Sequence, residues 1–204
     1  MKFLIYGHCG NMGQRYKAIL ENLRYEWAGV DVGGREVNFS RVQDYDGIII
    51  ATPTYNHLEI LDKVYEFNKP ILCEKPFTKD MTALENRMDY YNRKKIKLQM
   101  VDQYGYLLNH DSTGITYYDY FKHGSDGLAW DCINIIKHAE GEVHLAERSP
   151  IWRCLINGQE IDVRMMDYAY LLMLEDWINN PHNECEKIFQ THEKVKRFAE
   201  ENGY

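Results

Sequence analysis

The chain has 204 residues, of which 45% are hydrophobic, so it can bury the core of one medium domain, or of one domain with a small second one. Its formal net charge of −7 disfavours general binding to nucleic-acid phosphates. No apolar run has the length of a membrane span or the features of a signal peptide, and the five cysteines form neither a disulfide framework nor a paired zinc motif. These features predict a reduced cytoplasmic protein without a metal site.

Strand and helix patterns alternate through the first hundred residues. Extended segments are expected at 3–6, 28–32, 46–51, 70–73 and 96–101. Apolar residues at helical spacing predict helices around 12–23, 58–65 and 84–91. Strands that alternate with helices predict right-handed crossovers and a parallel sheet with both faces covered.

The second hundred residues follow a different pattern. β-Branched and aromatic residues predict a strand over 114–121, and a helix is expected over 128–139. Residues 142–161 predict two strands joined by a turn at Asn157-Gly158. Helices around 166–177 and 185–199 close the chain. A small α+β segment is therefore expected after the parallel α/β unit.

A glycine-rich turn follows the first predicted strand and opens the first predicted helix. Gly7, Gly10 and Gly13 have the spacing G-x-x-G-x-x-G, one residue longer at the front than the dinucleotide fingerprint. In such a turn the backbone approaches a pyrophosphate, and the N–H groups of the helix start, here around Asn11 and Met12, bind the phosphates. A glycine-rich turn without a ligand is the alternative. The context of strand before and helix after favours a dinucleotide site.

The residues after the second predicted strand bear on the choice of cofactor. Asp31 lies close to the position, ~20 residues beyond the turn, where an acidic side chain accepts the ribose hydroxyls of NAD. Arg35 follows two glycines and could instead meet the 2′-phosphate of NADP. Asp31 could also be an ordinary loop residue. Both NAD and NADP stay open, with NAD favoured.

Two further motifs complete a family resemblance. Residues 51–57 read Ala-Thr-Pro-Thr-Tyr-Asn-His, and residues 74–76 read Glu-Lys-Pro. With the glycine turn, in this order and spacing, they resemble the Gfo/Idh/MocA family of nicotinamide-dependent oxidoreductases. The resemblance covers the first hundred residues well and the remainder only loosely.

The resemblance implies a fold and an activity. The expected fold class is α/β, with a Rossmann dinucleotide-binding domain over 1–101 and a small α+β domain over 102–204 built on an open-faced sheet. The second domain would bind substrate and form a homo-oligomer, expected to be a dimer. The expected reaction is hydride transfer between NAD or NADP and an alcohol or ketone of a sugar, polyol or nucleotide sugar.

Loops at the carboxyl ends of parallel strands form the ligand crevice of such a sheet. The glycine turn, residues 52–57 and residues 74–76 all occupy such ends and should converge. We expect Thr52, Pro53 and Thr54 to border the cofactor and Glu74 to position the loop or the cofactor. Thr54 or Asn56 could instead cap the following helix. His57 matches the loop histidine of the family, and a structural role is favoured over proton transfer.

Lys75 is the expected catalytic residue. The resemblance assigns this lysine to the substrate oxygen, where an ammonium group stabilises negative charge during hydride transfer. It can also take part in proton transfer. The resemblance further implies a cis peptide bond between Lys75 and Pro76. A surface lysine in a loop is the alternative.

The helix motif Asp-x-x-x-His, which many members carry in the second domain, is incomplete here. Asp131 matches the aspartate and is a second expected catalytic residue, with a solvated residue at the helix start as the alternative, but Ile135 stands at the histidine position. His138 lies too far along the helix to replace that histidine simply. With Tyr104 and Tyr106, which follow the last predicted strand of the first domain, it is an expected substrate contact.

The missing histidine and the short second domain keep two other functions open. One is a dinucleotide-binding sensor or assembly protein without dehydrogenase activity. The other is a reductase of imine or ene substrates, which needs less base catalysis from the protein.

Overall fold

The computed structural model describes residues 1–31, 41–107, 117–121, 130, 142–145 and 153–201. The chain divides into two compact units. Residues 1–101 and 176–191 form the first unit, and residues 102–175 and 192–204 form the second. The expected second domain included 176–191, which the structure groups with the N-terminal residues. The functional roles assigned to the two domains stay a prediction.

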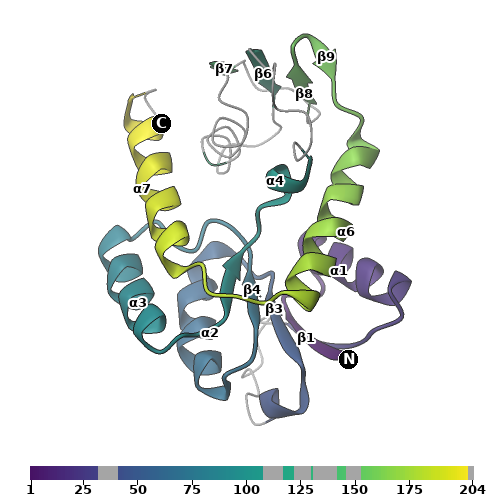
Figure 1. Ribbon diagram of the computed structural model, residues 1–204, viewed down its shortest axis with the longest axis vertical. Helices are drawn as coiled ribbons and strands as arrows, with labels where there is room; N and C mark the ends of the chain where they lie inside the picture. Colours follow the sequence, from purple (N-terminus) through teal and green to yellow (C-terminus); the bar gives the residue numbers. More distant parts are fainter. Residues whose placement is uncertain (32–40, 108–116, 122–129, 131–141, 146–152, 202–204) are drawn as a thin grey trace. The chain divides into compact units, whose positions relative to one another are not determined.

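A five-stranded parallel sheet organises the first unit (Figure 1). Its strands, in the spatial order β2-β1-β3-β4-β5, are β2 (Glu26–Val30), β1 (Lys2–Tyr6), β3 (Gly47–Ile50), β4 (Ile71–Cys73) and β5 (Leu98–Met100). All residues of β3 and β4 are buried, as expected for strands covered on both faces. The chain moves one way from β1 to β2 and the other way from β3 to β5, so the topological switch lies beside β1 and β3.

Within the described residues, these strands are connected by the helices α1 (Asn11–Asn22), α2 (His57–Val64) and α3 (Met81–Arg93). In Figure 1, α1 lies on one side of the sheet, whereas α2 and α3 lie on the other. The predicted apolar face of α1 is confirmed, because Tyr16, Ile19 and Leu20 are buried. The described parts of the connections also contain the short 3₁₀ turns η1 (Val42–Asp44), η2 (Thr54–Asn56) and η3 (Tyr65–Phe67).

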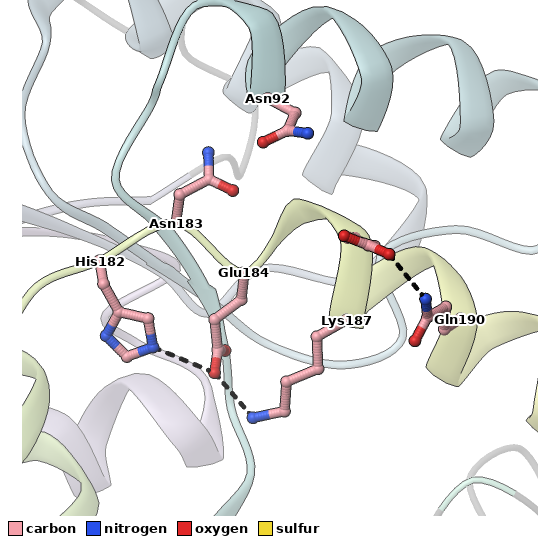
Figure 2. A pocket seen from close by; sticks show the side chains of 7 residues that line it. Asn92, His182, Asn183, Glu184, Lys187 and Gln190 are labelled. Carbon is pink, nitrogen blue, oxygen red and sulfur yellow. Dashed lines mark hydrogen bonds and ion pairs between the residues drawn. The ribbon is translucent and has the colours of Figure 1, made fainter.

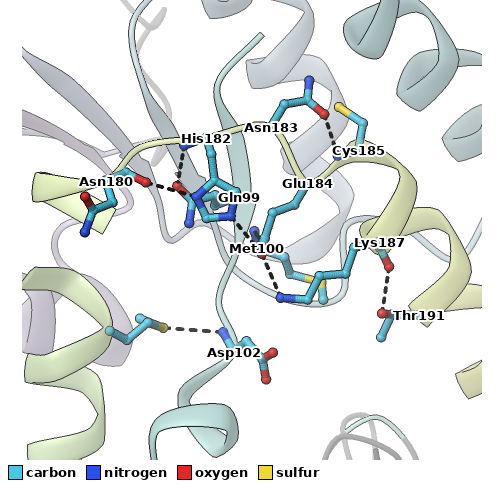
Figure 3. A network of polar contacts seen from close by, with 11 residues as sticks. Gln99, Met100, Asp102, Asn180, His182, Asn183, Glu184, Cys185, Lys187 and Thr191 are labelled. Atoms are coloured by element: carbon cyan, nitrogen blue, oxygen red, sulfur yellow. Dashed lines mark hydrogen bonds and ion pairs between the residues drawn. The ribbon is translucent and has the colours of Figure 1, made fainter. Parts of the chain in front are cut away.

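The chain returns to the first unit through the end of α6 (Val163–Asn179) and the start of α7 (Cys185–Glu201). The Trp177 ring packs against Phe3, with 5.7 Å between ring centroids, and faces Gly47. The segment between the helices binds the edge strand β5: Glu184 N donates to Leu98 O, and His182 N donates to the Gln99 side chain (Figure 3). This segment satisfies backbone groups that an edge strand would otherwise expose.

The second unit contains a mixed four-stranded sheet in the order β7-β6-β8-β9. Its strands are β6 (Tyr117–Phe121), β7 (Glu142–Leu145), β8 (Arg153–Ile156) and β9 (Gln159–Glu160), preceded by the short helix α4 (Gln103–Leu107). The predicted turn is confirmed, since Asn157 and Gly158 have φ angles of 51° and 77° and join β8 to β9.

Two expected boundaries are wrong. Residues 142–145 pair in parallel with β6, so the hairpin spans only 153–160 and not the whole of 142–161. β2 begins at Glu26 rather than Ala28 and ends at Val30, because it continues as long as its parallel pairing with β1 does. The predicted α/β class, with a small α+β second unit, is confirmed. Of the helices within the described residues, none has the length and apolar character needed to cross a bilayer.

Because Trp177 is buried in the first unit, its replacement tests whether residues 176–191 pack there. Replacement of this side chain, 1% exposed, by alanine should reduce the free energy of unfolding by about 3–5 kcal/mol through lost burial and a cavity. Tyr168→Ala on the same helix is the control, because that ring is 60% exposed and should change stability by less than about 0.5 kcal/mol. Equal effects of both substitutions in chemical denaturation would contradict this placement.

Candidate functional site

The glycine turn follows β1, and its conformation requires glycine at two of its positions. Gly7 has a φ angle of +82°, and its N–H donates to Val30 O at 2.7 Å. A Cβ at Gly7 would lie 2.6 Å from Ala51 O, and a Cβ at Gly13 would collide with Gly7 O. The turn therefore presses its backbone against the end of β3 and against the start of α1.

Gly10 differs from its two neighbours in the motif. It precedes α1 as the N-cap residue, has an ordinary extended conformation and makes no side-chain cap. A Cβ at Gly10 would approach Gly7 O at 3.4 Å, an ordinary van der Waals contact. The chain itself therefore does not require glycine here. Asn11 and Met12 follow in the first helical turn, whose N–H groups have no intrahelical acceptor and favour an anion.

The loop after β3 adds a buried polar group. Thr52 is 6% exposed, and within the described residues its hydroxyl oxygen Oγ1 has no hydrogen-bond partner. A buried hydroxyl without a partner is costly, and a bound ligand is one way to satisfy it. Pro53 is exposed and Thr54 is half-buried in η2. Asn56 precedes α2 without a side-chain capping bond, so the capping alternative is wrong for Asn56.

His57 joins this loop to the Glu-Lys-Pro turn. Its ring is 1% exposed, with Nε2 2.7 Å from Thr52 O and Nδ1 2.9 Å from Pro76 O. A neutral imidazole can donate to only one of these carbonyl oxygens, whereas an imidazolium donates to both. Burial lowers the pKa of His57, and the two carbonyl contacts oppose that effect. These contacts support the structural role that the sequence favours.

The Glu-Lys-Pro turn follows β4. Glu74 N donates to Ile50 O at 2.8 Å, which places the turn beside the end of β3. The Glu74 carboxylate is buried and accepts hydrogen bonds from the Tyr16 hydroxyl at 2.7 Å and the Lys75 N–H at 3.2 Å. Lys75 is half-buried, and its peptide bond to Pro76 is cis, as the resemblance implies.

Asp31 lies next to the glycine turn. It follows β2 directly, is exposed, and accepts a hydrogen bond from Cys9 that raises the pKa of that thiol. Because Cys9 belongs to the glycine turn, the end of β2 and the turn are neighbours at the same edge of the sheet. No motif in the sequence predicts this contact between Cys9 and Asp31.

The remaining predicted residues divide into two groups. Arg35, Asp131, Ile135 and His138 lie outside the described residues. Tyr104 is 2% exposed and Tyr106 is half-buried, and both belong to the short helix α4. The described part of the chain contains no group of three or more His, Cys, Asp or Glu side chains that could hold a metal ion.

A separate polar pocket of about 400 Å³ lies between the end of α3 and the start of α7 (Figure 2). Lys187 and His182 both contact the Glu184 carboxylate there, at 2.7 and 3.4 Å. Its lining residues are Asn92, His182, Asn183, Glu184, Glu186, Lys187 and Gln190. None of the predicted site residues is among them.

Comparisons with known proteins agree with the dinucleotide-binding class of fold that the glycine turn and the parallel sheet indicate. Residues 36–102 match the model of an oxidoreductase family with an NAD-binding Rossmann fold. That family is Gfo/Idh/MocA, so the predicted resemblance is confirmed over this segment. The chain is also similar to inositol 2-dehydrogenase 1 of Paenarthrobacter aurescens, with 54% identity over 37 residues. That match covers 18% of this chain and only 11% of the relative.

Solved structures share the fold along most of the chain. A dehydrogenase from Clostridium difficile has a TM-score of 0.71 at 12% identity and covers 97% of this chain and 99% of its own. UDP-N-acetylglucosamine 3-dehydrogenase from Acidithiobacillus ferrooxidans has a TM-score of 0.68 at 14% identity, covering 97% and 96%. The WlbA dehydrogenase from Thermus thermophilus, solved with NAD and α-ketoglutarate, has a TM-score of 0.64 at 10% identity, covering 94% and 92%. At these identities the likeness shows the fold alone.

The lowered pKa of His57 predicts a pH-dependent stability. Its pKa in the folded chain lies below the ordinary value of 6.5, so below that pH the unfolded chain binds more protons than the folded one. Stability should therefore fall as the pH drops through 6.5 towards the folded pKa. We expect the loss of unfolding free energy between pH 7 and pH 5 to be smaller in His57→Gln than in the wild-type chain. Parallel pH profiles in denaturant titrations would contradict this.

Proposed function

We propose that the chain is an NAD(P)-dependent dehydrogenase or reductase that transfers a hydride between nicotinamide and an alcohol or ketone carbon. The observation that carries the proposal is the convergence of the glycine turn, the uncapped start of α1 and the unpartnered Thr52 hydroxyl at one edge of the sheet. Close backbone packing, free N–H groups and an orphaned buried oxygen fit a dinucleotide pyrophosphate and its flanking groups.

The residues take the following roles in this proposal. The backbone of Gly7, Gly10, Asn11, Met12 and Gly13 binds the pyrophosphate, and the loop Thr52, Pro53 and Thr54 borders the cofactor, with His57 holding that loop. Asp31 accepts the ribose hydroxyls and thereby favours NAD, because its exposed carboxylate would repel a 2′-phosphate. Arg35 is the residue that would favour NADP.

Lys75 supports the chemical step. A bound nicotinamide supplies the hydride chemistry. The Lys75 ammonium stabilises negative charge on the substrate oxygen as the carbonyl forms or is reduced. Glu74 positions the lysine through the Lys75 N–H. Asp131 is the proposed partner that takes the hydroxyl proton in oxidation and returns it in reduction, with Tyr104, Tyr106 and His138 as proposed substrate contacts.

We propose sugars, polyols or nucleotide sugars as the substrate class. The names of the inositol and UDP-N-acetylglucosamine dehydrogenases support this class. A homo-oligomer formed through the second unit stays a prediction.

One observation favours a different function. Ile135 replaces the family histidine, and an isoleucine cannot exchange protons. A dinucleotide-binding sensor or assembly protein would need no such group, and a reductase of imine or ene substrates would need it less. A panel of alcohols, imines and activated alkenes, followed by absorbance at 340 nm, distinguishes these functions. Cofactor binding without any absorbance change favours the sensor.

Gly10→Ala tests the cofactor site, because Gly10 has room for a methyl group in the free chain. We expect the variant to keep its thermal midpoint within about 2 °C and to lose dinucleotide affinity at least about tenfold, since the methyl group occupies the approach of the phosphates. Calorimetric titration with NAD and NADP measures the affinity. Unchanged affinity in a folded variant, or no affinity in the wild-type chain, contradicts the proposal.

Lys75→Ala tests the catalytic role. The variant should retain dinucleotide affinity within about twofold and lose at least about 100-fold in turnover, as expected when a group that stabilises developing charge is removed. Lys79→Ala is the control, because Lys79 lies four positions later and is exposed. Wild-type turnover in Lys75→Ala would reject the assignment.

A further inference from the structure

A buried contact ties the helix of the glycine turn to the Glu-Lys-Pro turn. Tyr16 lies in α1 and is fully buried, and its hydroxyl donates to Glu74 Oε1 at 2.7 Å. The second oxygen of the same carboxylate accepts from the Lys75 N–H at 3.2 Å. One carboxylate therefore contacts both the proposed phosphate-binding helix and the proposed catalytic residue.

This contact is costly to break. Glu74 is 8% exposed, and a hydrogen bond from a buried hydroxyl to a carboxylate is stronger than one between neutral groups. Loss of the hydroxyl leaves a buried acceptor without one of its donors, so the carboxylate turns or the chain around it shifts. Either response moves the Lys75 N–H, which is bonded to the same group.

We propose that Tyr16 is a positioning residue that orients Lys75 through Glu74 and couples the start of α1 to the Glu-Lys-Pro turn. A dinucleotide that binds the N–H groups of α1 then also steadies the turn that carries the lysine. The role of Lys75 in this inference rests on the proposed function, whereas the link from Tyr16 to the turn is a property of the free chain.

The chain offers a matched control. Tyr91 in α3 is 1% exposed, and its hydroxyl donates to the Asp62 carboxylate at 2.6 Å. Tyr16→Phe and Tyr91→Phe thus each remove one hydroxyl bonded to a carboxylate. Only the Tyr16 hydroxyl contacts the Glu-Lys-Pro turn. An effect of lost stability alone would appear in both variants.

Hydrogen exchange measured by mass spectrometry tests the link without any turnover. In the free chain, Tyr16→Phe should speed exchange of the peptide over 71–78 at least about fivefold, whereas Tyr91→Phe should leave it within about twofold of wild type. NAD should slow exchange of this peptide in the wild-type chain, and the slowing should be lost in Tyr16→Phe. Wild-type exchange in free Tyr16→Phe, or equal slowing by NAD in both chains, overturns the inference.

Glu74→Gln provides a second probe if Tyr16→Phe does not fold. Its amide retains one acceptor oxygen but cannot accept two hydrogen bonds through two oxygens. The turn peptide should exchange faster in Glu74→Gln alone, and wild-type exchange in that variant would overturn the inference. Where Tyr16→Phe folds, adding it to Glu74→Gln should give no further increase, because both substitutions break the same path. Additive increases would overturn the inference.

Kinetics complete the test. Tyr16→Phe should lower kcat about tenfold with dinucleotide affinity within about twofold, while Tyr91→Phe should leave kcat unchanged. Failure of the wild-type chain to bind NAD or NADP would reject the proposed function, yet the exchange measurements on the free chain would still decide whether Tyr16 holds the turn.

Discussion

The first unit depends on the contact between the backbone of the glycine turn and the backbone of its neighbours. A Cβ at Gly7 would lie 2.6 Å from Ala51 O, and one at Gly13 would overlap Gly7 O. These contacts hold the ends of β1 and β3 and the start of α1 together. Because the strands are parallel, their carboxyl ends meet at one edge, and the loops that carry Thr52 and Lys75 follow from there.

Buried polar contacts then fix the loops that the sheet brings together. His57 lies within hydrogen-bond distance of the carbonyl oxygens of Thr52 and Pro76, and the Tyr16 hydroxyl donates to the carboxylate of Glu74. Such contacts are specific in direction, whereas apolar packing is not, so they determine the orientation of a loop more closely. Among the described residues of the loop after β3, the Thr52 hydroxyl is buried without a hydrogen-bond partner, and the proposed function assigns it to the cofactor.

The sequence predicts much of this unit because its signals are local. The apolar run of β3, the helical spacing of Tyr16, Ile19 and Leu20, and the turn glycines each act through near neighbours. The same reasoning assigned Tyr16 only to the core, because its partner Glu74 is 58 positions away in the sequence. The available signal was Glu74 itself: a carboxylate in the Glu-Lys-Pro motif, next to a buried strand, needs a hydrogen-bond donor nearby.

The second unit was harder to predict for a physical reason. The parallel pairing of β7 with β6 joins segments about 25 positions apart, and no turn motif specifies it. The Asn157-Gly158 turn, by contrast, acts over four residues and is confirmed. The inclusion of 176–191 in the first unit likewise depends on distant contacts, such as that of Trp177 with Phe3.

The measurement that tests the central claim most directly is a crystal structure of the chain with NAD. It should show the pyrophosphate at the N–H groups that begin α1, a ligand atom bonded to Thr52 Oγ1 and the Lys75 ammonium facing the nicotinamide. A dinucleotide bound elsewhere, or a lysine directed away from the ring, would contradict the account.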